Sequence, residues 1–252
     1  MRLTLVGHAT VLIELDGVRL LTDPLLRDRT LVLRAEPREL DPAWSRELDA
    51  VLLSHFHRDH YDPRSLRRLD AATLVVGPRG THRRLRRHRR TNVTELQPGE
   101  STLVGSVSVR ATPALHGRVP GPFASTALGF VVSGSKRVYF AGDTDLFPEL
   151  AELASEELDV ALVPVAGWGP RLGAGHLDPH RAAEAVRLIE PRLAVPIHWG
   201  LLSPVGVARF NPRYLRDPGE SFARAVAELA PTVEVRILHP GESLELAGSA
   251  RG

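Results

Sequence analysis

The stretch that decides the fold is Leu52-Leu53-Ser54-His55-Phe56-His57-Arg58-Asp59-His60, an apolar run that ends in three histidines and one aspartate. His55 and His57 are two residues apart, so in extended backbone their side chains point the same way and can bind one metal ion together. Asp59 and His60 follow where the chain must turn, and they can reach a second ion. The alternative is a polar loop rich in histidine by chance. We predict a metal site, because the preceding apolar run indicates a buried strand that carries the cluster at its end.

Three more residues extend this pattern along the chain. His116, Asp143 and His198 each follow a β-type run and have a glycine within two residues, which is typical of side chains presented on tight turns at a sheet edge. Taken singly, each is more often a hydrogen-bonded structural residue. Taken with the cluster at residues 55–60, they become candidate ligands, because a site for two ions needs more than four.

Composition limits what kind of site this can be. The 252 residues contain no cysteine, which excludes disulfides, thiolate zinc sites and cysteine nucleophiles, so any metal must be held by nitrogen and oxygen. The net charge of +2 gives no general case for nucleic-acid binding. No apolar stretch is long enough to span a membrane, and residues 2–16 lack the uninterrupted apolar block of a signal peptide. We therefore expect a single-domain cytoplasmic protein.

The remaining periodicity predicts an α/β fold. Short β-type runs open the chain, with a hairpin turn at Asp16-Gly17, and strands alternate with helices in the second half. Expected strands are 3–6, 11–15, 18–21, 50–53, 73–76, 107–109, 128–132, 138–140, 160–163, 193–195 and 233–238. Expected helices are 63–69, 79–90, 146–154, 179–189 and 218–229, the last two opened by the pairs Asp178-Pro179 and Asp217-Pro218.

The motif His55-Phe56-His57-Arg58-Asp59-His60, followed by His116, Asp143 and His198, resembles the metallo-β-lactamase superfamily in order and spacing. The resemblance covers nearly the whole chain. It implies a four-layer αββα sandwich over residues 1–246, with a tail at 247–252, and a dinuclear metal site at one edge. It further implies three groups of ligands: His55, His57 and His116 on the first ion, Asp59, His60 and His198 on the second, and Asp143 bridging the two.

Other motifs are similar to the N-acyl-phosphatidylethanolamine-hydrolysing phospholipase D group and, in part, to the L-ascorbate-6-phosphate lactonase group. These motifs are Gly7-His8-Ala9-Thr10-Val11-Leu12, Leu21-Thr22-Asp23-Pro24, Ala141-Gly142-Asp143-Thr144, Gly175-His176-Leu177-Asp178-Pro179, Ile197-His198-Trp199-Gly200 and Leu238-His239-Pro240-Gly241-Glu242. The chain lacks the long N-terminal extension of the animal phospholipases. The resemblance implies that His176 contacts the substrate or assists its leaving group, although His176 could instead support the helix after Asp178-Pro179. His8 and Asp23 are candidates to orient metal ligands from behind, and a structural turn role is open for Asp23.

These residues predict a hydrolase. Two divalent ions, zinc by expectation with iron or manganese as alternatives, would provide a bridging hydroxide as the nucleophile, and Asp59 would orient it. The leading substrate class is a phosphodiester, as for a phospholipase D, and the alternative is a lactone or another ester such as a sugar-phosphate lactone. Either substrate is a small or lipid-like anion.

The segment Arg79–Arg90 contains seven arginines and two histidines, His82 and His88. As one helix it would align Arg79, Arg83, Arg86 and Arg90 in a stripe. The simplest interpretation is a solvated outer helix. The functional alternative, from a different class, is a protein that binds an anionic surface through this helix and uses metal only structurally. Under this alternative the anionic partner is a membrane surface rather than nucleic acid, because no aromatic residue interleaves the run to stack on bases.

Overall fold

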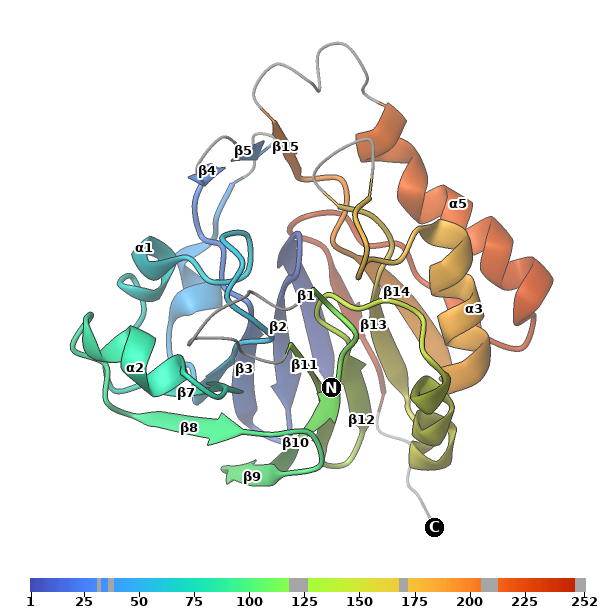
Figure 1. The fold of residues 1–252 in the computed structure, drawn as a ribbon. Helices are drawn as coiled ribbons and strands as arrows, with labels where there is room; N and C mark the ends of the chain where they lie inside the picture. The colour runs from blue at the N-terminus through green and yellow to red at the C-terminus, as the bar shows by residue number, and fades with distance from the viewer. Residues whose placement is uncertain (31–32, 36–38, 118–126, 168–171, 205–212, 248–252) are drawn as a thin grey trace.

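The structure is a computed structural model that describes residues 1–30, 33–35, 39–117, 127–167, 172–204 and 213–247. Two β-sheets lie face to face, with α1 and α2 on the outer face of one and α3 and α5 on the outer face of the other (Figure 1). This arrangement confirms the predicted four-layer α/β sandwich. The pairing of Leu246 with Met1 brings the C-terminal strand onto the first sheet, and the predicted tail lies outside the described residues beyond Ala247.

The first sheet has the strand order β17-β1-β2-β3-β6-β7-β8. Strands β1, β2 and β3 form the antiparallel meander that the Asp16-Gly17 turn predicts. Strands β3, β6, β7 and β8 run parallel to one another. The bounds are β1 Arg2–Gly7, β2 Thr10–Leu15, β3 Val18–Thr22, β6 Ala50–Leu52, β7 Leu74–Pro78, β8 Val93–Leu96 and β17 Ser243–Glu245.

The second sheet has the order β16-β14-β13-β12-β11-β10-β9, antiparallel from β9 to β12 and parallel from β12 to β16. The bounds are β9 Ser101–Val104, β10 Val107–Pro113, β11 Leu128–Ser133, β12 Arg137–Phe140, β13 Val160–Pro164, β14 Leu193–Ile197 and β16 Glu234–Val235. A small third sheet joins β15 Leu202–Pro204, β5 Leu33–Ala35 and β4 Arg29–Thr30. Of the strand predicted at residues 233–238, only residues 234–235 form a strand, β16, which pairs with β14 in the second sheet.

Alternation along the strands fills three apolar layers. Leu52 of the first sheet and Phe130 of the second both lie in the core between the two sheets. The outer face of the first sheet, with Val51, packs against Leu66 of α1 and Leu85 of α2. The outer face of the second sheet packs against α3 and α5. Side chains two residues apart share a face, so alternate apolar side chains of one strand fill the core between the sheets and the layer under the helices. Polar residues are found at the strand ends.

The sequence predicts two helix starts, of which the one at Asp178-Pro179 is confirmed. α1 (Pro63–Leu66) and α3 (Pro179–Ile189) start with an aspartate whose carboxylate accepts backbone N–H bonds, followed by a proline in the first turn. The predicted start of the last helix at Asp217-Pro218 is wrong: α5 spans Arg213–Leu229 and contains Pro218, where proline forgoes one backbone hydrogen bond. The helix expected at 146–154 is a 3-10 helix, η2 (Pro148–Glu156), and a short η1 covers Pro42–Ser45.

The predicted arginine stripe is also wrong. The helix α2 covers only Thr81–Arg86, after Gly80 in a left-handed conformation. Arg79 therefore precedes the helix. Arg90 lies beyond it, is 3% exposed, and donates to the carbonyl oxygens of Leu66, Leu69 and Asp70. Arg90 is thus a structural residue that ties the end of the arginine-rich segment to α1.

We expect Arg90→Met to destabilise the fold by about 3 kcal/mol, because charge-assisted hydrogen bonds are lost and the Leu69 carbonyl is left buried without a donor. Urea unfolding measures the effect, and Arg89→Met, at an exposed position next to it, is the control. Equal stability of the two variants would contradict this structural role.

Candidate metal centre

The candidate ligands follow strand ends that meet at one edge of the sandwich. His8 follows β1 and residues 55–60 follow β6 in the first sheet, whereas His116, Asp143 and His198 follow β10, β12 and β14 in the second. The structure brings all seven predicted ligands together there, and His8 with them. Each sheet therefore contributes one part of the site, which no single segment of the chain could form.

The first group consists of His55, His57, His116 and Asp143, whose ligand atoms all lie within 4.8 Å of one another. Nδ1 of His57 is 2.9 Å from Nε2 of His116. The Nε2 atoms of His55 and His116 each lie 3.8 Å from Oδ2 of Asp143. This is the set that the sequence predicts for the first ion, together with the predicted bridging carboxylate.

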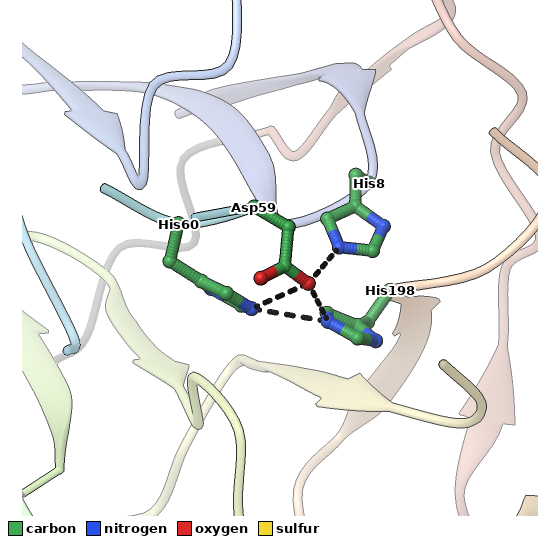
Figure 2. A group of neighbouring side chains, drawn as sticks. All are labelled: His8, Asp59, His60 and His198. Atoms are coloured by element: carbon green, nitrogen blue, oxygen red, sulfur yellow. Dashed lines mark hydrogen bonds and ion pairs between the residues drawn. The ribbon is translucent and has the colours of Figure 1, made fainter. Parts of the chain in front are cut away.

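The second group consists of His8, Asp59, His60 and His198 (Figure 2), again with ligand atoms within 4.8 Å of one another. Oδ2 of Asp59 lies 3.6 Å from Nε2 of His60 and 3.4 Å from Nε2 of His198. These two nitrogens are 3.0 Å apart. The group contains the three residues predicted for the second ion, and His8 as a fourth.

Asp143 lies between the two groups. Its Oδ2 is 3.2 Å from Nε2 of His60, and its Oδ1 is 3.2 Å from Nε2 of His198. The same carboxylate faces His55 and His116 of the first group, and it is almost completely buried. One carboxylate in contact with both groups is the arrangement that a bridging ligand requires.

The electrostatics of the cluster follow from its burial and its mixed charges. Burial alone raises the pKa of Asp143, but the nearby His198 and His60 outweigh it and hold that pKa well below its usual range. Burial likewise opposes protonation of His60, whereas Asp143, Asp59 and Asp23 raise its pKa well above the usual range. The pKa of His55 is lowered well below its usual range, chiefly by burial. Asp143 therefore stays ionised at neutral pH beside His60 and His198.

Four histidines are oriented from behind through Nδ1. His116 and His198 donate Nδ1–H to the carbonyl oxygens of Gly175 (2.6 Å) and Ala166 (2.8 Å). His60 donates to Oδ2 of Asp23 at 2.7 Å. His55 donates to the Ser54 hydroxyl at 2.9 Å, since that hydroxyl itself donates to Asp23. In each case Nε2 is left facing the centre, the usual arrangement of histidines that bind metal.

Asp23 lies where the predicted supporting role requires it. Its fully buried carboxylate accepts from the backbone N–H and the hydroxyl of Ser54 and from His60. It also has a left-handed backbone conformation, with a φ of 33°, so its position is compatible with both of its suggested roles. His8 and His198 have φ values of 59° and 64°. Left-handed backbone at three non-glycine residues of one cluster is typical of a functional site.

The donor set fits divalent metal ions. Nε2 of His55 is buried and makes no hydrogen bond among the described residues. The pairs His57–His116 and His60–His198 each bring two ring nitrogens within 3.0 Å, so their lone pairs face one another unless a proton or a metal ion lies between them. Neutral imidazoles and carboxylates are suitable ligands for zinc, iron and manganese. The buried cluster is therefore able to bind metal.

His176 borders the centre on its more exposed side. Its Nε2 lies 3.6 Å from Oδ2 of Asp143, its ring packs edge-on against His116, and its side chain is 23% exposed. The alternative role, support of the following helix, belongs to Asp178, whose carboxylate accepts the backbone N–H of Arg181. The position of His176 is thus suited to contact with a substrate.

The comparisons with known proteins agree with this geometry. The model of the beta-lactamase superfamily domain matches residues 18–199. A UPF0173 metal-dependent hydrolase from Methanopyrus kandleri is 37% identical, over 97% of this chain and all of that protein. One from Opitutus terrae is 33% identical, over 98% of this chain and all of that protein. The solved structure of Igni18, a metallo hydrolase from Ignicoccus hospitalis, has a TM-score of 0.72 and 25% identity, with 98% of this chain and 99% of that one covered.

Fold and site together define a metal-dependent hydrolase of the metallo-β-lactamase fold. The chain belongs to the beta-lactamase superfamily and, within it, to the UPF0173 family of metal-dependent hydrolases. This confirms the predicted superfamily and the prediction of an enzyme. The narrower resemblance to the phospholipase D and lactonase groups stays a prediction, because the relatives carry only the broader name.

Two backbone carbonyl oxygens and one hydroxyl that orient the histidines were not identified from the sequence. The carbonyl oxygens of Gly175 and Ala166, which orient His116 and His198, belong to loops far from these histidines in sequence. Ser54 was within reach, since it lies beside His55 and its hydroxyl links that histidine to Asp23.

Proposed function

We propose that this hydrolase cleaves a phosphodiester at a dinuclear metal centre. The observation that carries the proposal is the position of Asp143, whose carboxylate contacts His55 and His116 of one histidine group and His60 and His198 of the other. One carboxylate that contacts histidines of both groups is the arrangement expected of a ligand shared by two ions.

The proposed ligands are those that the sequence motif implies: His55, His57 and His116 for one ion, Asp59, His60 and His198 for the other, and Asp143 for both. Zinc is the expected metal, with iron and manganese as alternatives. Ions bound there would lower the pKa of water and neutralise negative charge that develops on a substrate oxygen. This chain supplies the geometry, because the Nδ1–H bonds to Asp23, Ser54, Gly175 and Ala166 fix the ring orientations in advance.

His176 is the proposed residue for substrate contact. Its Nδ1 faces the carbonyl oxygen of Gly173 at 3.2 Å, so Nδ1–H donates there. Nε2 is then directed at the centre, beside Asp143. From this position the protonated ring can donate Nε2–H to a phosphoryl oxygen, or give that proton to the leaving oxygen.

The proposed second substrate class is a lactone or another ester. The same ligands serve both classes, because they set the chemistry of the attacking water and not the shape of the substrate. The support for a phosphodiester is the resemblance of the motifs around His8, Asp23 and His176 to the phospholipase D group. The expected cytoplasmic location likewise stays a prediction. Among the described residues, no helix has the length and apolar character needed to span a bilayer.

Hydrolysis of bis(4-nitrophenyl) phosphate by zinc-loaded protein tests the proposal. We expect turnover by the wild type and a loss of roughly 10³-fold in His57→Ala, because several kcal/mol of charge stabilisation depend on the metal. His82→Ala, at an exposed position, is the matched control. Turnover of a lactone panel without turnover of the diester would move the assignment to the second class.

A second observation concerns charge. Residues 58–90 contain eleven arginines against three aspartates, so this segment has a net charge of +8 in a chain whose total is +2. Two of these aspartates, Asp59 and Asp62, are buried, whereas most of the arginines on and around α1 and α2 are exposed. None of the large apolar side chains exposed among the described residues lies in this segment. The surface of residues 58–90 is thus suited to electrostatic contact without insertion.

We propose that this surface adsorbs to anionic lipid headgroups. Each arginine near such a surface contributes about 1 kcal/mol, so Arg86→Gln with Arg87→Gln should weaken binding to phosphatidylserine-containing vesicles roughly 30-fold. Arg187→Gln with Arg224→Gln, at exposed positions on α3 and α5, is the control pair. Equal vesicle binding by both pairs, or binding of duplex DNA but not of vesicles, would contradict this proposal.

A further inference from the structure

The two ring nitrogens of the clustered histidines have different partners, and this separates ligands from supporting residues. In His55, His60, His116 and His198, Nδ1 has an acceptor behind the ring and Nε2 faces the centre. A histidine that binds metal almost always donates its other ring N–H in this way. These four histidines therefore have the proton on Nδ1 and a lone pair on Nε2 when a metal is bound.

His8 has the opposite arrangement. Its Nε2 lies 3.1 Å from Oδ2 of Asp59 (Figure 2), and its Nδ1 is buried without a hydrogen-bond partner among the described residues. Distance alone would make His8 a fourth ligand of the second group, since its ring nitrogen lies within 4.8 Å of the ligand atoms of Asp59, His60 and His198. Its hydrogen bonds indicate a different role.

The position of the proton decides between the two roles. If His8 bound metal through Nε2, its proton would sit on Nδ1 and be buried without an acceptor, which is costly. If the proton sits on Nε2, it is donated to the Asp59 carboxylate and only a lone pair is left unpaired. The carboxylate of Asp59 lies within hydrogen-bonding distance of Nε2, at 3.1 Å, so the geometry favours the second arrangement.

We propose that His8 is a positioning residue and not a metal ligand: it donates Nε2–H to Oδ2 of Asp59 and holds that carboxylate against His60 and His198. This inference rests on the proposed dinuclear centre. It leaves the second ion with Asp59, His60, His198 and the shared Asp143 as its protein ligands.

The backbone of His8 supports the same role. Its carbonyl oxygen accepts the backbone N–H of His198 at 3.0 Å, and the ring centroids of the two histidines are 3.8 Å apart. The left-handed φ of 59° at His8 is an uncommon conformation for a residue other than glycine. In this conformation His8, in the turn between β1 and β2, contacts Asp59 through its ring and the donor N–H of His198 through its backbone carbonyl.

Long-range ¹H–¹⁵N correlation spectra of protein with ¹⁵N-labelled histidine test the proposal directly. We expect His8, assigned by its absence in His8→Gln, to have its proton on Nε2 in both the metal-free and the ¹¹³Cd-loaded protein. We also expect coupling to ¹¹³Cd at His60 and His198, and none at His8. A proton on Nδ1 of His8, or ¹¹³Cd coupling at its Nε2, would overturn the inference. Failure of the protein to bind cadmium would count against the proposed centre, whereas the metal-free spectrum still gives the tautomer of His8.

Two substitutions separate donation from ligation. Gln at position 8 retains an amide N–H near the place of Nε2, whereas Leu removes the donor at similar volume. We expect His8→Leu to weaken metal binding at the second site about 10- to 100-fold, and His8→Gln to restore most of it. If His8 were a ligand, the two variants would lose affinity equally. Circular dichroism of both variants checks that the fold is retained.

Discussion

Asp143→Asn is expected to abolish measurable hydrolysis while the protein stays folded. The amide keeps the size of the side chain but removes the negative charge that faces both histidine groups. A loss of several kcal/mol in charge stabilisation corresponds to a fall of about 10³-fold or more in kcat/KM. The substitution should also reduce the bound metal, which elemental analysis of the purified protein measures alongside the rate.

The control for this variant is Asp217→Asn, which makes the same chemical change at an exposed position on α5. It should leave both rate and metal content unchanged. An Asp143→Asn protein with full metal content and wild-type turnover would show that this carboxylate is not shared between two ions, and the proposed centre would have to be abandoned.

Removal of metal is expected to lower the thermal stability strongly. The centre buries two carboxylates and several ring nitrogens against one another, and ions that bind only the folded state stabilise it. At a free concentration about 1,000 times the dissociation constant, each ion contributes about 4 kcal/mol. For a chain of this size, each kcal/mol shifts Tm by about 2–4 °C, so two ions should raise Tm by more than about 10 °C.

Scanning calorimetry with and without a chelator measures this difference. His57→Ala, which removes one proposed ligand of the first ion, should show a clearly smaller metal-dependent shift than the wild type. A chelator-treated wild type that melts at the same temperature as the zinc-loaded protein would mean that the cluster binds no ion of consequence to the fold.

Much of the site was predictable because its residues are marked by side-chain type and by position at strand ends. The two-residue spacing of His55 and His57 after an apolar run indicated one shared direction, and His116, Asp143 and His198 repeated the pattern at other strand ends. The structure brings these segments to one edge because alternating apolar residues bury both faces of each sheet. Patterning therefore predicted the α/β class and the cluster, whereas the four-layer sandwich followed from the resemblance to the metallo-β-lactamase superfamily.

The parts that sequence reasoning missed have physical reasons. Short polar strands such as β8 and β17 carry too few apolar residues to show a period, and they form because neighbouring strands offer backbone partners. Arg90 resembles its exposed neighbours in sequence but is buried by carbonyl acceptors on another segment. The contrast between His8 and the ligand histidines depends on which ring nitrogen finds a partner, which residue type alone does not encode.

Anomalous diffraction at the zinc edge from crystals of the zinc-loaded protein shows directly how many ions the cluster binds. We predict two peaks in each chain, one among His55, His57 and His116 and one among Asp59, His60 and His198, with Asp143 between them. A single peak, or peaks away from this cluster, would contradict the dinuclear centre.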